Sequence, residues 1–478
     1  MRRAISFLTL MLMLLSGCGV SGSIEEFPEG VGPIYPDYMD VTVPASIAPL
    51  NFCYTDAGPG TPVTTFSAGD CSLSVKGRTV QIPPKKWSRL MAAAKGGEVQ
   101  VSSSAGGLSW KIYVSEDEID YGLNYRKLAP GYEVYSKMGI YERNLSSFDE
   151  HPLIENTSFD GCVNCHAYNR CEPSDMSLHV RGDHGATLLR FGGRMQAYNT
   201  KTDSTLGFCV YPCWHPSGKY IAYSTNSTRQ SFHAQRDKLI EVFDVDSDML
   251  VYDIDAGRLL LAPHIMQKDV WETFPALSPD GETLYFCAAS ARQIPSEFEQ
   301  IRYNLCKTSF ASVKDGSAEA AVDTVVFAEG QGGSISFPKP SFDGKWLMYT
   351  LSDYGQFSIW HHEADLWVMN LSTGECRALD EANSSDTESY HNWSSNSRWF
   401  VFASRRDDGQ YTRPYICHFS EDGVCGKPFM LPQKDPRKHY LEEMLSYNVP
   451  EFVSGPVDFD FTGASKLINS PERIDFGL

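Results

Sequence analysis

The segment Cys162-Val-Asn-Cys165-His166 holds the residue types with the most specific chemistry in this chain. Two thiols three positions apart can add across the two vinyl groups of one porphyrin, and the adjacent imidazole then lies beside the iron. With 13 cysteines and 12 histidines in 478 residues, the pattern arises by chance about 0.01 times per chain of this composition. The segment therefore predicts one covalently attached c-type haem, with Cys162, Cys165 and His166 as the residues that bind it.

His166 is the expected proximal ligand of the iron, and the sixth coordination position requires a second side chain or stays open. The candidates near the motif are His151, Met176, His179 and His184. Among them we favour His179, with Met176 as a further metal-ligand candidate. Arg181 is expected to neutralise a haem propionate, and Arg170 is a second candidate for this role.

The same cysteines allow two other interpretations. Cys162 and Cys165 could form a redox disulfide, although no βαβ pattern surrounds them. Zinc is the stronger alternative, because Cys162, Cys165 and Cys171 could combine with a cysteine of the nearby Cys209-x-x-x-Cys213 or with a histidine to give four soft ligands. A structural disulfide cluster would use the same thiols. In either case the chain would be a non-haem scaffold that binds a protein or peptide.

The first residues of the chain predict export. Arg2-Arg3 precedes an apolar run from Ile5 to Leu15, which is too short to span a bilayer and is typical of a signal peptide. Small residues then lead to Cys18, whose thiol would receive lipid. We expect a signal peptide over 1–17 and a lipidated flexible stalk over 18–40. The protein would be an outer-membrane lipoprotein that faces the periplasm or the cell surface and contacts the membrane through its acyl chains.

Charge and motifs exclude other functions. The formal net charge is −19, so a nucleic-acid partner is disfavoured because phosphates would be repelled. The chain has no Gly-x-Ser-x-Gly elbow and no α/β half after its repeats, so an acyl-transfer triad has no place in it. We therefore expect a binding or redox protein rather than a hydrolase, with a protein partner on one face of its main domain.

Short alternating runs over 41–125 predict a small β-sandwich, interrupted by one helix over 85–95. The second half of the chain repeats a strand, a tight turn and an aromatic strand, with the turns at Gly218, Gly281, Gly344 and Ser397. One hairpin cannot bury both of its faces, so such repeats must stack and close radially into a β-propeller. We assign 126–455 to the propeller, 155–185 to a haem-binding insertion that it carries, and 456–478 to a C-terminal tail.

The turn Ser278-Pro-Asp-Gly281 resembles the repeats of TolB-type propellers. A longer set of motifs is similar to a Bacteroidetes lipoprotein family whose members are commonly labelled TolB-like or cytochrome c biogenesis proteins. These motifs are Phe159-Asp-Gly-Cys-Val-Asn-Cys-His166, Tyr211-Pro-Cys-Trp-His-Pro-Ser-Gly218, Ser389-Tyr-His-Asn-Trp393 and Ser404-Arg-Arg-Asp-Asp408. The resemblance covers nearly the whole mature chain and implies an all-β, TolB-like propeller of six blades. Only four turns are clear, and Ser397 replaces the usual glycine.

These observations favour an exported propeller with one covalent haem, which acts in electron transfer or in ligand or redox sensing. One further pairing follows from spacing. Cys417 and Cys425 flank the turn Ser420-Glu-Asp-Gly423, so a hairpin would bring the two thiols within disulfide reach.

Overall fold

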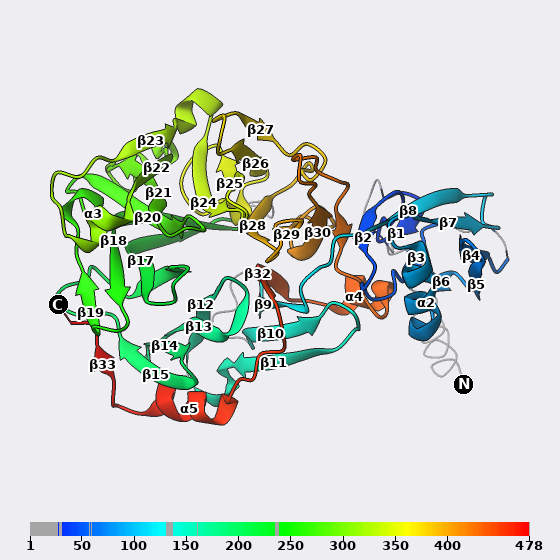
Figure 1. Ribbon diagram of the computed structural model, residues 1–478, viewed down its shortest axis with the longest axis horizontal. Helices are drawn as coiled ribbons and strands as arrows, with labels where there is room; N and C mark the ends of the chain where they lie inside the picture. Colours follow the sequence, from blue (N-terminus) through cyan, green and yellow to red (C-terminus); the bar gives the residue numbers. More distant parts are fainter. Residues whose placement is uncertain are drawn as a thin grey trace, which may run out of the picture.

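The computed structural model describes residues 27, 31–56, 58, 60–130, 137–159, 161–234 and 239–477. The expected signal peptide, the lipidation site Cys18 and most of the expected stalk lie outside the described residues. Within the described residues, no helix is both long enough and apolar enough to cross a bilayer. The chain forms two bodies that lie side by side, a small N-terminal domain and a larger ring of sheets (Figure 1).

The N-terminal domain packs a five-stranded sheet, ordered β2-β8-β7-β4-β5, with a three-stranded sheet, ordered β1-β3-β6. Its elements are β1 (Ile34–Tyr35), β2 (Thr42–Pro44), β3 (Phe52–Tyr54), β4 (Val63–Ala68), β5 (Cys71–Lys76), β6 (Thr79–Val80), α2 (Pro84–Ala94), β7 (Glu98–Ser103) and β8 (Ser109–Ser115). Trp87, Leu90, Met91 and Ala94 give α2 one buried face, as helical periodicity requires. Because β1 pairs with β3, part of the expected stalk is packed structure.

Among the residues that the structure describes, the larger body consists of six sheets around a common axis (Figure 1). The innermost strands are β12 (Cys162–Asn169), β16 (Cys209–Trp214), β20 (Val270–Leu277), β24 (Ser334–Pro340), β28 (Glu388–Trp393) and β32 (Ser446–Val453). Antiparallel neighbours extend each sheet outward. This is the all-β propeller architecture that the repeats predict.

Successive hairpins supply the outer strands of five sheets. They are β13 (Glu172–Arg181), β14 (Ala186–Phe191) and β15 (Arg194–Asn199); β17 (Tyr220–Phe232), β18 (Ile240–Asp253) and β19 (Arg258–Leu260); β21 (Thr283–Ser290), β22 (Asn304–Ser309) and β23 (Asp323–Val326); β25 (Trp346–Ser352), β26 (Asp365–Asn370) and β27 (Cys376–Ala378); and β29 (Trp399–Ser404), β30 (Arg413–His418) and β31 (Phe429–Met430). Two short helices, α3 (Phe310–Lys314) and α4 (Pro436–Glu442), lie in the connections.

The sixth sheet closes the ring, because it joins strands from both ends of the larger body. Here β32 pairs with β9 (Gly122–Leu128), which is followed outward by β10 (Gly139–Asn144) and β11 (Glu150–Glu155). The expected C-terminal tail is also packed: α5 (Phe461–Asn469) contacts β15, and β33 (Ile474–Asp475) pairs with it in parallel. Pairing of distant segments removes the exposed strand edges of an open ring.

The segment expected as a haem-binding insertion is part of a sheet. Residues 162–169 form β12 and residues 172–181 form β13, the two inner strands of one sheet. The reason is local: His166, Tyr168, Leu178 and Val180 alternate with side chains of the opposite face, as in a strand buried on both sides.

A bulge recurs in all six innermost strands, where two residues lie opposite one residue of the neighbouring strand. In five of these strands the first bulge residue has a left-handed backbone, with φ between 49° and 54°; these residues are Tyr211, Phe274, Phe337, Tyr390 and Val449. In β12 the bulge residues are Asn164 and Cys165. The bulge directs this ring of side chains toward the axis, where the strands surround a cavity.

Candidate functional site

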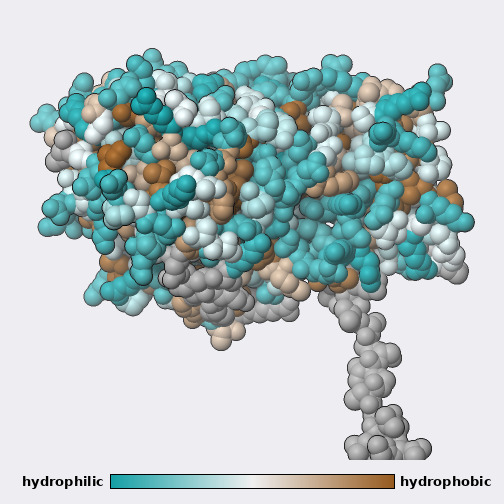
Figure 2. Space-filling model, turned by 90° about the horizontal axis from the view of Figure 1, so that it is seen from below, coloured by the Kyte–Doolittle hydropathy of each residue, from teal (hydrophilic) through white to brown (hydrophobic). Residues whose placement is uncertain are grey.

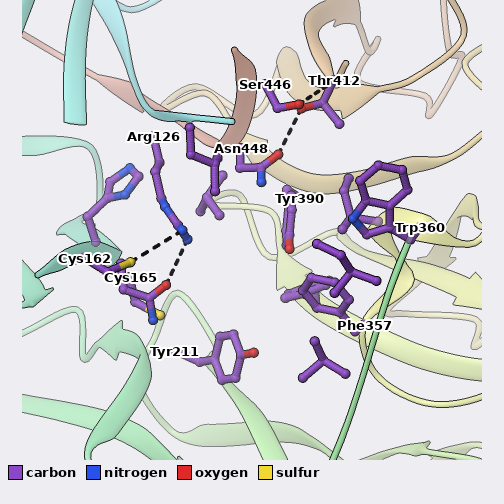
Figure 3. A pocket seen from close by; sticks show the side chains of 18 of the residues that line it. Arg126, Cys162, Cys165, Tyr211, Phe357, Trp360, Tyr390, Thr412, Ser446 and Asn448 are labelled. Atoms are coloured by element: carbon purple, nitrogen blue, oxygen red, sulfur yellow. Dashed lines mark hydrogen bonds between the residues drawn. The ribbon is translucent and has the colours of Figure 1, made fainter. Parts of the chain in front are cut away.

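The cavity at the centre of the six sheets has a volume of about 550 Å³. This lies within the range of small-molecule sites, roughly 300–1,000 Å³. Residues of every bulge line it, together with residues of several loops. Figure 3 shows side chains from several strands that surround one open space, with Cys162 and Cys165 on one wall and Tyr390 and Trp360 on another.

Cys162, Cys165 and His166 all line this cavity. Cys165 is the second residue of the β12 bulge, and His166 follows it. The bulge matters because strict alternation would place the side chains of neighbouring residues on opposite faces of the strand. The structure therefore brings together the three residues that the sequence predicts to bind haem.

The His166 ring is 4% exposed. Neither of its ring nitrogens has a hydrogen-bond partner among the described residues. Burial lowers the pKa of His166 to about 3, and the nearby Arg126 guanidinium and Lys339 ammonium act in the same direction. The backbone of Asn124 acts in the opposite direction, but by less than burial. A neutral, unpartnered imidazole is the form of histidine that ligates a metal.

Arg126, on β9, connects the β12 bulge to the closing sheet. One guanidinium nitrogen, Nη1, donates to Asn164 Oδ1 at 2.9 Å, and Nη2 donates to Cys162 Sγ at 3.8 Å (Figure 3). The buried Nε has no partner among the described residues. Arg126 thus holds the side chains of Cys162 and Asn164 in place, while its Nε–H group stays available as a donor.

The favoured sixth ligand, His179, does not line the cavity. It lies on β13 opposite the β12 bulge, and its Nδ1 is 3.0 Å from Thr187 Oγ1. In the other five sheets the corresponding position holds a buried aromatic residue: Tyr125, Tyr223, Phe286, Tyr349 or Phe402. His179 therefore takes a core position between sheets, against Phe208. Burial lowers its pKa to about 3.

The other residues that the sequence suggests as a sixth ligand do not line the cavity and lie apart from one another. Met176 belongs to the apolar core that contains Tyr168 and Leu178. His151 lies on β11, the outermost strand of its sheet, 3.6 Å from Glu142. His184 lies in the turn after β13. Proximity in sequence failed as a guide here, because a hairpin carries the chain away from the axis immediately after β12.

The two arginine candidates are also separated. Arg181 lines the central cavity and is exposed. Arg170 lines a second, smaller cavity of about 90 Å³, where its Nη1 donates to the carbonyl of Pro279 at 3.1 Å. Of these two candidates, Arg181 is therefore the one placed to neutralise a ligand in the central cavity.

An aromatic collar is the main feature of the site that the sequence analysis missed. Tyr211, Phe274, Phe337 and Tyr390 are consecutive around the axis, with ring centroids 4.5, 4.2 and 4.9 Å apart. A signal was present, since an aromatic residue followed by proline recurs as Tyr211-Pro, Phe274-Pro and Phe337-Pro at intervals of 63 residues. Trp360 and Arg405 also line the cavity, and the Arg405 guanidinium lies 3.7 Å from the Trp360 ring centroid.

The cysteines proposed for a zinc site do not gather with the motif. Cys171 donates to the carbonyl of Trp393, Cys209 donates to that of Thr200, and the Cys213 sulfur accepts from the amide of Leu277. Across the part of the chain that the structure describes, no three His, Cys, Asp or Glu residues are grouped so as to hold a metal ion.

No protein-family model matches this chain, and neither does any curated protein. Solved structures do. TolB from Agrobacterium tumefaciens is 13% identical over 66% of this chain and 89% of its own, with a TM-score of 0.40. The periplasmic gluconolactonase PpgL of Pseudomonas aeruginosa is 15% identical over 63% and 81%, with a TM-score of 0.38. Hydrazine synthase of Kuenenia stuttgartiensis is 13% identical over 72% of this chain and 47% of that chain, with a TM-score of 0.44.

The six sheets around one axis define the class of the protein by themselves: this chain is a β-propeller. The site places a Cys-x-x-Cys-His segment on the innermost strand of one sheet, facing the central cavity.

Proposed function

We propose that this chain is a six-bladed propeller that carries one covalently attached c-type haem in its central cavity and acts in electron transfer or in redox or ligand sensing. The observation that carries the proposal is that Cys162, Cys165 and His166 line one cavity. A zinc or disulfide scaffold has less support, because the further cysteines that it needs lie in separate environments.

The residues of the cavity fit such a group. His166 supplies a buried, neutral imidazole whose nitrogens are unpartnered among the described residues. The aromatic collar supplies an apolar wall, and Arg181 and Arg126 supply cations for carboxylate groups. Cys162 and Cys165 would hold the group through thioethers and His166 would ligate its iron. When bound, the haem would supply a one-electron couple or a site for a small ligand.

Covalent attachment can be tested by expressing the exported chain together with a haem-attachment system and measuring its intact mass. The mature chain should gain the mass of one haem, and its Soret absorbance should persist through acidic acetone extraction. Replacing both motif cysteines, Cys162→Ala with Cys165→Ala, should abolish the added mass.

The matched control is Cys213→Ala, because Cys213 follows the bulge of the next innermost strand but lies outside the motif. This variant should gain the full mass. His166→Gln should impair attachment and alter the spectrum of any bound iron. A mature chain without added mass, recovered from cells that load a known c-type protein, would refute the haem and leave a propeller scaffold.

We also propose that acylation of Cys18 anchors the protein in the outer membrane. The support comes from the sequence, since an apolar run and small residues precede this cysteine. Cys18→Ala should release the protein from the membrane fraction or stall its processing. If the variant fractionates with membranes and is trimmed at the same place, the anchor is something else.

A further inference from the structure

The central cavity is lined by more positive than negative side chains, in a protein whose formal net charge is −19. Four cationic residues line it: Arg126, Arg181, Lys339 and Arg405. Glu451 is the one carboxylate among the described lining residues. Burial raises the pKa of Glu451 to about 7, and it accepts a hydrogen bond from the amide of Tyr168 at 3.1 Å. The charge of this wall therefore opposes that of the whole molecule.

The aromatic collar adds two hydrogen-bond donors to the same wall. The hydroxyls of Tyr211 and Tyr390 have no hydrogen-bond partner among the described residues, and Figure 3 shows both pointing into the open space. Burial raises the pKa of both tyrosines, Tyr211 well above its ordinary value. Both phenols remain protonated at neutral pH and can donate a hydrogen bond.

Lys339 adds a cation to the wall of the same cavity. It follows the bulge of β24 and lines both the central cavity and the second, smaller one, as Asn392 and Glu451 also do. Its ammonium group makes no hydrogen bond or ion pair within the part of the chain that the structure describes. The wall of the central cavity thus carries one ammonium group and two phenolic hydroxyls that have no hydrogen-bond partner among the described residues.

We infer that the central cavity binds a small anion, a carboxylate or an oxoanion, through the hydroxyls of Tyr211 and Tyr390 and the ammonium of Lys339. A ligand that offers only donors could not pair with these three donors of the half-buried cavity wall, whereas an acceptor-rich anion can pair with all of them. Hydrogen bonds to a charged partner are also the stronger kind. The inference goes beyond the haem, because none of the three residues belongs to the Cys-x-x-Cys-His segment.

The test measures binding of sodium acetate, sodium nitrite and the neutral acetamide by calorimetry, with the haem-loaded chain and with the Cys162→Ala, Cys165→Ala chain. At least one of the two anions should bind both chains with a Kd on the order of 1 mM or tighter, and acetamide should bind far more weakly. Tyr211→Phe, Tyr390→Phe and Lys339→Gln should each weaken anion binding roughly tenfold or more, since a hydrogen bond to a charge contributes about 1.5–3 kcal/mol.

Two control variants separate the site from general effects of charge and hydroxyl loss. Tyr113→Phe and Lys345→Gln alter exposed residues away from the cavity and should leave the affinity unchanged. The inference is overturned if neither anion binds, if acetamide binds as well, or if the three cavity variants bind like the controls. Binding to the haem-free chain alone also overturns it, because the donors would then serve the haem carboxylates. Failure of the haem proposal shows separately, as a wild-type chain without added mass.

Discussion

The β12 sheet and the other five sheets of the propeller share one backbone device and use it differently. Each innermost strand has a bulge that directs side chains toward the axis. Elsewhere the position holds an aromatic residue or Val449, in left-handed backbone conformation. In β12 the two bulge residues are Asn164 and Cys165, and the φ angle of Asn164 is not positive. The fold thus provides one bulge per sheet around the cavity. In five sheets the first bulge residue is aromatic or aliphatic, whereas the bulge of β12 carries an amide and a thiol.

Truncation at the bulge gives the largest difference between the sheets. Phe274 is 3% exposed and packs between Tyr211 and Phe337, so Phe274→Ala should lower the free energy of unfolding by about 3–5 kcal/mol. Asn164→Ala removes one acceptor of Arg126 and should cost about 1–2 kcal/mol. Denaturant unfolding of both variants measures this. Equal losses would show that the collar does not stabilise the ring.

The sheets also differ in the length of their hairpins, and the β17–β18 hairpin is long. A buried ion pair links this hairpin to a neighbouring loop. His361 Nε2 lies 3.5 Å from Glu241 on β18, and Nδ1 lies 2.9 Å from Glu363. These carboxylates outweigh burial and raise the pKa of His361 to about 9.

Because the folded-state pKa of His361 lies above its ordinary value, the stabilisation is complete below about pH 6.5 and is lost as pH rises toward 9. Its size is on the order of 3 kcal/mol. The His361→Gln variant should be less stable than the wild type at pH 6, and this difference should shrink by pH 9.5. A difference that stays constant across this range would contradict the pair.

The β28 sheet carries two facing thiols. Cys417 Sγ and Cys425 Sγ lie 3.4 Å apart and are buried. The pairing predicted from their spacing therefore needs little movement. Oxidation should raise stability by about 2–3 kcal/mol, because the bond closes a short loop in the unfolded chain. Intact mass and unfolding, with and without reductant, measure this, with Cys417→Ala as the control. Recovery of both thiols from exported protein would count against the pairing.

The smallest effect is expected at the hairpin turns. Gly218, Gly281 and Gly344 have φ between 69° and 76°, and Ser397 takes the same place in the last repeat with φ 60°. Ser397→Gly relieves about 1 kcal/mol of backbone strain, but it removes the hydroxyl that accepts from the amide of Asp343 at 3.0 Å. The net change in unfolding free energy should stay below about 1 kcal/mol. A larger loss would show that the hydrogen bond dominates.

Much of the fold could be predicted from the sequence, because it depends on patterns among residues that are close together in the chain. Alternating aromatic strands and turns at Gly218, Gly281 and Gly344 indicate hairpins that must stack, and the buried face of α2 follows from its periodicity. The motif Cys162-Val-Asn-Cys165-His166 is likewise local, so its residues and their chemistry could be recognised without a structure.

Tertiary structure decided which residues share the cavity with that motif. His179 is close in sequence but occupies a core position opposite the bulge, whereas Tyr390 and Lys339 come from strands about 170–230 residues away. The physical reason is radial closure: each innermost strand reaches the axis once, and the next hairpin leads outward. One short segment of each sheet therefore supplies the side chains at the axis. These segments are far apart in the sequence, and closure of the ring brings them together.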